Sequence, residues 1–170
     1  LSENKLPAEA LKHLGKLGML KTLGLESNKL SALPADVCTL NNLTSLSVAH
    51  NTLTSLPDAI GALGKLKTLS LAHNGLSVLP ESMCAMASLT TIDASSNRLQ
   101  SLPAGFGHLA ALVTANFSNN RIGMLPDGLG GLKRLKALDL RQNAPLVVHA
   151  ASNGLPADLL LHTPLHRLEV

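Results

Sequence analysis

The sequence predicts an α/β solenoid, a curved stack of coils with a parallel sheet on the concave face and short helices or 3-10 turns on the convex face. The first indication is a ladder of asparagines with a period of 23 residues: Asn28, Asn51, Asn74, Asn97, Asn120 and Asn143. The second is the fixed spacing of leucines before each asparagine, and the third is a Leu-Pro pair after it. One repeat of this length cannot bury its apolar face alone, so the copies must stack.

Each coil is expected to begin with a short strand. Between Leu66 and Asn74, Leu69 and Leu71 alternate with small or polar residues, the period of two that is typical of a strand with one buried face. The asparagine follows where the chain turns away from the strand. Its amide both donates and accepts hydrogen bonds, so a buried copy in each coil can satisfy backbone groups that the turn leaves unpaired.

The chain is expected to return through a short helical or 3-10 segment. Pro80 lacks an N–H and fixes φ, which ends the extended course, and Met83 and Met86 are three residues apart, the spacing of a 3-10 turn. The glycine-rich strings Gly105–Gly107 and Gly128–Gly131 occur at matching positions of this return. They lack the Gly-Lys-Ser/Thr that completes a nucleotide-binding loop, so they indicate close packing of coils.

Both ends depart from the regular repeat. Residues 7–17 predict a true helix with Leu11, Leu14 and Leu17 on one face, since Pro7 suits a first helical turn. Near the other end, extra residues predict a longer surface loop over 144–154. We expect one domain over residues 1–170 with about seven coils, truncated in mid-repeat at both ends. In the core, Phe117 is expected to fill space left by Ala94 and Ala115.

The pattern Leu-x-x-Leu-x-Leu-x-x-Asn-x-Leu-x-x-Leu-Pro covers nearly the whole chain and resembles the leucine-rich repeat family. The repeat length and the Leu-Pro pair resemble the intracellular subclass that includes Ras-associated repeat proteins. This resemblance implies a non-catalytic module or scaffold that binds a protein or peptide. It also suggests a small GTPase or a signalling complex as the partner.

Composition excludes several other classes of function. A net charge of +3 is mild, and the chain has no Trp or Tyr on which bases could stack, so nucleic-acid binding is not expected. No run of 18 apolar residues supports a membrane span. Cys38 and Cys84 are two coils apart, about 10 Å, too far for a disulfide. These free thiols favour a reducing, cytoplasmic setting.

No catalytic site, cofactor site or metal site is expected. His50 and His73 occupy equivalent positions in adjacent coils and could share a metal only with a third ligand from Glu26 or Asp93. Sequence variation at a solvent-exposed position that recurs in every repeat explains the two histidines more simply. A flat sheet face also offers no enclosed pocket in which to activate a nucleophile, so the protein is not expected to be an enzyme.

The predicted partner-binding surface lies on the concave strands of the later coils. There, Asp93, Asn116 and Asp139 form one column, which Arg98, Arg121 and Arg141 are expected to flank, while His50 and His73 extend the face toward earlier coils. An ordinary solvated face with scattered charge is the alternative. Two other functions also stay open: a structural spacer in a cytoskeletal or axonemal protein, and the recognition arm of a larger enzyme.

Overall fold

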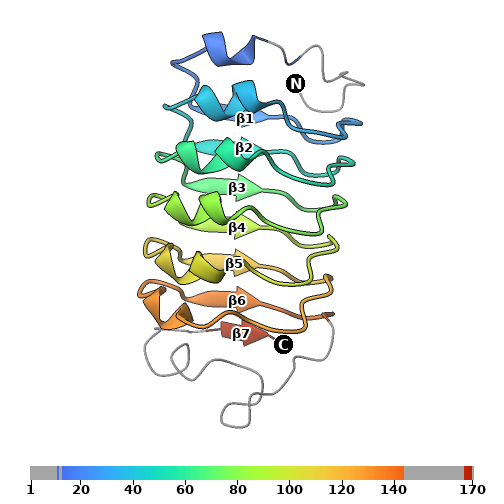
Figure 1. The fold of residues 1–170 in the computed structure, drawn as a ribbon, viewed down its shortest axis with the longest axis vertical. Coiled ribbons are helices and arrows are strands. Elements are labelled where there is room, and N and C mark those ends of the chain that lie inside the picture. Colours follow the sequence, from blue (N-terminus) through green and yellow to red (C-terminus); the bar gives the residue numbers. More distant parts are fainter. Residues whose placement is uncertain (1–10, 12, 144–166, 170) are drawn as a thin grey trace.

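The computed structural model describes Leu11, residues 13–143 and residues 167–169. Within this part, the strands form one parallel sheet in sequence order, which confirms the predicted solenoid (Figure 1). The strands are β1 (Thr22–Gly24), β2 (Ser45–Ser47), β3 (Thr68–Ser70), β4 (Thr91–Asp93), β5 (Thr114–Asn116), β6 (Ala137–Asp139) and β7 (Arg167–Glu169). Their outward side chains form what we call the sheet face.

Short 3-10 helices form the opposite layer, the helical face, as the spacing of Met83 and Met86 predicts (Figure 1). They are η2 (Leu14–Lys16), η3 (Ala35–Thr39), η4 (Asp58–Ala62), η5 (Glu81–Ala85), η6 (Ala104–His108) and η7 (Leu129–Gly131). Prolines stand at the N-caps of η3 to η6, where the missing N–H costs no helical hydrogen bond. No described helix is long and apolar enough to cross a membrane.

The helix expected over residues 7–17 is wrong where the structure describes that segment. Leu11 and Leu14–Lys16 have 3-10 conformation and do not form one α-helix, and the left-handed φ of 79° at His13 separates them. Leu11 is fully buried but Leu17 is 50% exposed, so these leucines do not share one buried face. Residues 7–10 and the loop expected over 144–154 lie outside the described residues.

The leucine core fills the space between the two faces. Equivalent strand residues align from coil to coil, for example Leu46 with Leu69 and Ile92 with Ala115, so each column repeats one packing site. Phe117 is fully buried in the column that also contains the small Ala94. Its ring meets Phe106 of η6 edge-on at 5.5 Å, a contact that the spacing of the repeats alone does not reveal.

The asparagine ladder joins each coil to the one before it. In Asn97, Nδ2 donates to the carbonyl oxygens of Leu71 at 3.0 Å and Ala94 at 3.1 Å, while Oδ1 accepts the N–H of Leu76 at 3.0 Å. Asn51, Asn74, Asn120 and Asn143 make the same set of bonds, and Asn28 donates within its own coil. One side chain thus satisfies groups on both sides of the turn.

The residue before each ladder asparagine adopts a left-handed backbone. These residues are Ser27, His50, His73, Ser96, Asn119 and Gln142, with φ between 53° and 56°. Side chains other than glycine and asparagine rarely adopt this conformation, and the interlocked turn imposes it here in every coil.

Candidate partner-binding surface

A column of polar side chains runs across four adjacent strands of the sheet face. Register places Asp93 beside Asn116, and Asn116 beside Asp139, as the sequence predicts. The structure adds Glu169 of β7, which aligns with Asp139. We call these four residues the polar column. The sequence did not identify Glu169 because the regular period is interrupted before β7.

Each of the first three column residues folds back on its own strand. Oδ1 of Asp93 accepts the N–H of Ser95 at 3.0 Å and its hydroxyl at 2.7 Å. Asn116 accepts the same two bonds from Ser118, and Asp139 accepts the N–H of Arg141 at 3.0 Å. These bonds hold the column side chains in place. They leave Oδ2 of Asp93 and Nδ2 of Asn116 without a partner among the described residues.

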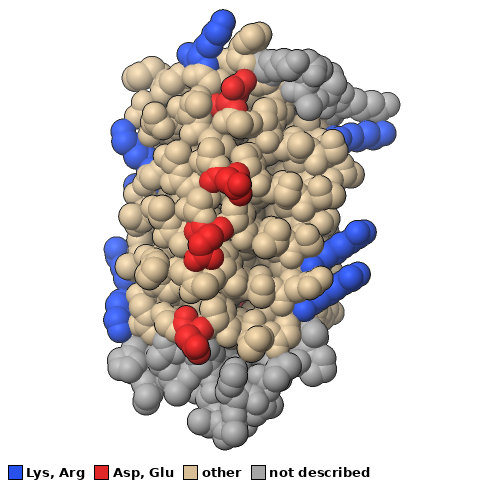
Figure 2. Space-filling model, in the orientation of Figure 1, with Lys and Arg blue, Asp and Glu red and all other residues tan. Residues whose placement is uncertain are grey.

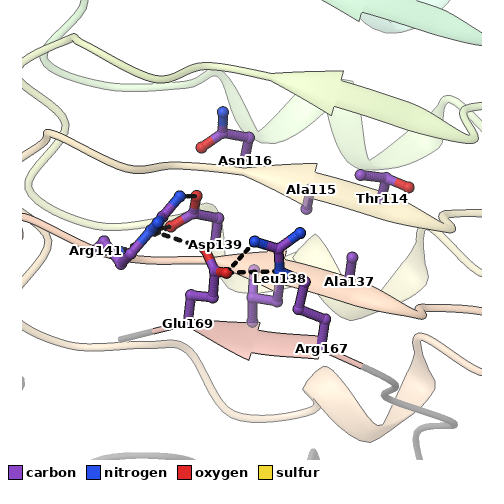
Figure 3. A pocket seen from close by; sticks show the side chains of 9 residues that line it. All are labelled: Thr114, Ala115, Asn116, Ala137, Leu138, Asp139, Arg141, Arg167 and Glu169. Carbon is purple, nitrogen blue, oxygen red and sulfur yellow. Dashed lines mark hydrogen bonds and ion pairs between the residues drawn. The ribbon is translucent and has the colours of Figure 1, made fainter.

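Ion pairs close the end of the column. Arg141 pairs with Asp139 at 2.7 Å and with Glu169 at 2.8 Å, and Arg167 pairs with Glu169 (Figure 3). The hydrogen bond from the Arg141 guanidinium is the main cause that lowers the pKa of Asp139. All four charges of this ionic quartet are therefore compensated, and Arg141, which flanks the column as the sequence predicts, is already paired.

A shallow hollow of about 210 Å³ lies over this end of the sheet face. Its floor is β5 and β6, and the ionic quartet stands at one side (Figure 3). The residues that line it are Thr114, Ala115, Asn116, Ala137, Leu138, Asp139, Arg141, Arg167 and Glu169. Fixed polar groups beside an open apolar floor are suited to hold a polar segment of another chain.

Arg98 and Arg121 do not flank the column as expected. Each follows a ladder asparagine, and their N–H groups bond to Leu76 and Leu99 of the preceding coils. They therefore lie past the carboxyl ends of the strands, five residues after the last residue of β4 and of β5. Both are exposed and neither forms an ion pair with a described residue. They make a separate basic edge.

The structure brings His50 and His73 together as their equivalent positions predict. Their rings stack with centroids 4.3 Å apart and planes 11° from parallel. Imidazole binds metals through nitrogen lone pairs in the ring plane, and parallel stacked rings do not direct these lone pairs to one point. No group of three or more His, Cys, Asp or Glu in the described part of the chain is placed to hold a metal ion.

A second outward column was missed in the sequence. Thr22, Ser45, Thr68, Thr91, Thr114 and Ala137 align along the sheet face at the other end of each strand, and Arg167 continues the series. The strand alternation that buries Leu69 also points Thr68 outward, so this column could have been predicted from the sequence. These small side chains widen the surface beside the polar column.

The Leucine rich repeat profile matches residues 18–76, 41–99 and 87–144, which together span most of the chain. No curated protein matches the chain significantly in sequence. Solved structures share the fold.

The leucine-rich repeat protein LIC12759 of Leptospira interrogans is 28% identical, with a TM-score of 0.71 over 99% of this chain and 46% of its own. The leucine-rich repeat domain of the type III effector XopL is 24% identical, with a TM-score of 0.77 over 94% of this chain and 55% of its own. The plant peptide hormone receptor RGFR1, solved in complex with RGF2, is 30% identical, with a TM-score of 0.73 over 84% of this chain and 23% of its own. The chain thus spans about half or less of each of these proteins.

Proposed function

The chain belongs to the leucine-rich repeat family, and on that premise we propose that it is a protein-interaction module that binds a protein or peptide on its sheet face. The polar column is the observation that carries the proposal, because its side chains are fixed before any partner arrives. Fixed groups lose little conformational freedom on binding. The proposal assigns recognition to the chain, with no reaction and no cofactor.

The free groups of the column define where a partner is held. Arg141 and Arg167 are already tied to carboxylates, so a partner carboxylate would have to displace these. Oδ2 of Asp93 and Nδ2 of Asn116 have no partner within the described part of the chain, the two residues are register partners, and they offer one acceptor and one donor. We therefore centre recognition on β4 and β5, and expect polar or main-chain amide groups of the partner there.

One finding on a relative supports the proposal. RGFR1 is a peptide hormone receptor whose structure contains a bound peptide hormone, and it is 30% identical over 84% of this chain. The XopL domain supports the fold alone. We extend the proposal to the partner that the family resemblance suggests, a small GTPase or a signalling complex. Such a partner is intracellular, and the free thiols of Cys38 and Cys84 support a reducing, cytoplasmic location for the chain.

Isosteric variants test the proposal with peptides selected on the wild-type chain from a random phage-displayed library. Asp93→Asn keeps Oδ1 to accept the bonds from Ser95 and replaces the other, charged oxygen with an uncharged donor. Asn116→Asp keeps Oδ1 for Ser118 and replaces the donor with a charged acceptor. We expect each variant to raise the Kd of the selected peptides at least tenfold in calorimetry, about 1.4 kcal/mol.

The matched control is the pair Asn41→Ala and Lys65→Ala, at exposed positions off the sheet face, which should leave the Kd unchanged. Asp139→Asn should have a smaller effect than Asp93→Asn, because both oxygens of Asp139 are engaged by Arg141. Peptides that bind the two column variants as tightly as the wild type would reject the sheet face as the binding surface.

A further inference from the structure

We propose that the helical face carries a second docking groove, which takes an extended peptide in which lysine or arginine alternates with apolar side chains. This groove is on the opposite layer from the polar column, so the inference goes beyond the proposed function. It rests on the shape, the exposed apolar side chains and the charge of that face.

Two hollows join to form the groove. The first, of about 480 Å³, extends from Ser55 to Ala104, and the second, of about 410 Å³, extends from Ser101 to Asp127. They share Ser101, Leu102 and Ala104 as lining residues, so together they form one depression across four coils. It follows the segments that lead into the 3-10 helices.

Exposed apolar side chains stand in this groove. Val78 lines the first hollow and is 55% exposed, and Met124 lines the second and is 51% exposed. Serines occupy the equivalent position in the alternate coils, at Ser55 and Ser101. The result is two apolar ridges separated by small residues, which leave room for the side chains of another chain.

The rim of the groove is acidic. Asp58 and Glu81 line the first hollow and Asp127 lines the second, and none of the Lys or Arg residues that the structure describes lines either. Figure 2 shows the same arrangement on a larger scale, with acidic side chains down the middle of this face and basic ones at its flanks and upper end. The Glu81 carboxylate is engaged by backbone N–H groups, whereas Asp58 and Asp127 are exposed and form no ion pair with a described residue.

Charge complementarity identifies the occupant. Val78 and Met124 lie two coils apart, and an extended chain with an apolar residue at every second position presents one apolar side chain about every 7 Å on the same side. A segment that runs along the stack can place an apolar side chain in each hollow. Long basic side chains between them reach the carboxylates of the rim, where exposed partners of opposite charge raise the rate and specificity of docking.

The probe is a fluorescein-labelled octapeptide of alternating lysine and leucine, measured by fluorescence anisotropy with the full chain. The matched probes replace lysine by glutamate, or leucine by serine. We expect the lysine–leucine peptide to bind at least tenfold more tightly than either. Val78→Ser with Met124→Ser should weaken it at least tenfold. Asp58→Asn with Asp127→Asn should do the same and remove most of the salt dependence.

The control pair is Leu17→Ser with Met19→Ser, which removes two exposed apolar side chains, 50% and 84% exposed, from outside the groove and should leave binding unchanged. Asp93→Asn on the sheet face should also leave it unchanged, so failure here is distinct from failure of the proposed function. Equal binding of the glutamate–leucine peptide, equal losses in the control pair, or no binding at all would overturn the proposal. Self-association that Val78→Ser with Met124→Ser abolishes in sedimentation velocity would assign the groove to a second copy of the chain and would also overturn it.

Discussion

The carboxylate of Glu81 caps the 3-10 helix of the following coil by accepting the N–H of Gly105 at 2.6 Å. Its second oxygen accepts the N–H of Ala104 at 3.0 Å. Helix η6 has no acidic residue in its own first turn and no side-chain cap from its N-cap proline, so the preceding coil supplies both. A Cβ on Gly105 would lie 2.7 Å from Oε1 of Glu81, and the glycine is what makes room for the cap.

This relationship predicts a strongly non-additive pair of substitutions. Glu81→Ala removes two hydrogen bonds at an exposed site and should lower the free energy of unfolding by about 1 kcal/mol. Gly105→Ala should cost about the same, because the flexible Glu81 side chain can move away from the new methyl only by giving up the cap. The double variant should then cost little more than either single variant.

Urea unfolding followed by circular dichroism measures all three variants. Costs that add fully in the double variant would show that the Gly105 methyl clashes elsewhere, with His108 or with Cys84, whose atoms are the next nearest. Glu81→Gln is a useful intermediate, since it keeps one acceptor oxygen but loses the charge.

Removal of a ladder asparagine should be costly. Asn97→Ala leaves the N–H of Leu76 and the carbonyls of Leu71 and Ala94 without their partner in a buried turn, and we expect a loss of about 2–3 kcal/mol. Asn41→Ala, at an exposed position between η3 and β2, should stay within about 0.5 kcal/mol. Equal urea midpoints for the two variants would contradict the interlocking role of the ladder.

The periodicity predicted the parts of the fold that repeat. Leu69 and Leu71 have the same spacing to Asn74 as their equivalents in neighbouring coils, so one argument predicted strands β1 to β6 and the 3-10 returns η3 to η7. The helix expected at Leu14 was misjudged because spacing alone cannot foresee the left-handed φ of His13. Such a backbone is imposed by the way neighbouring coils meet.

The candidate sites were only partly predictable, for a different reason. Strand alternation places Asp93, Asn116 and Asp139 in one column, but it does not reveal which of their atoms are already bonded. That Arg141 is neutralised by Glu169 depends on β7, whose register is set by tertiary pairing. The groove at Val78 and Met124 lies in segments without a regular alternation, so the direction of these side chains could not be predicted from spacing.

Close approach of coils makes particular glycines irreplaceable. A Cβ on Gly61 would overlap the backbone carbonyl of Ser82, and backbone cannot move aside as a side chain can. Gly61→Ala should therefore destabilise the fold by about 2 kcal/mol or more. A Cβ on Gly64 would meet nothing within 4 Å, so Gly64→Ala is the matched control, expected to be neutral or slightly stabilising. Thermal unfolding compares them, and equal melting temperatures would refute the backbone contact between η4 and η5.

The two cysteines should react slowly in the folded protein. Burial raises the pKa of Cys38 to about 11, and burial together with the nearby charge of Glu81 raises the pKa of Cys84 to about 11. Only the thiolate is nucleophilic, so iodoacetamide at pH 8 should alkylate both at least tenfold more slowly than in the unfolded chain. Mass spectrometry of each cysteine peptide gives the two rates.

The same shifts make stability depend on pH. The pKa of each thiol is higher in the folded protein than the value of about 8.5 in the unfolded chain. The thiols therefore make their full contribution to the free energy of unfolding below pH 8.5, and this contribution is lost as the pH rises toward 11. The double variant Cys38→Ala with Cys84→Ala should lose stability less steeply over this pH range, which separates the effect of the thiols from that of lysines with nearby pKa values.

Glu81→Gln should speed alkylation of Cys84 but not of Cys38, since the carboxylate raises only the pKa of Cys84. Equal acceleration at both cysteines would instead indicate general loosening of the coils.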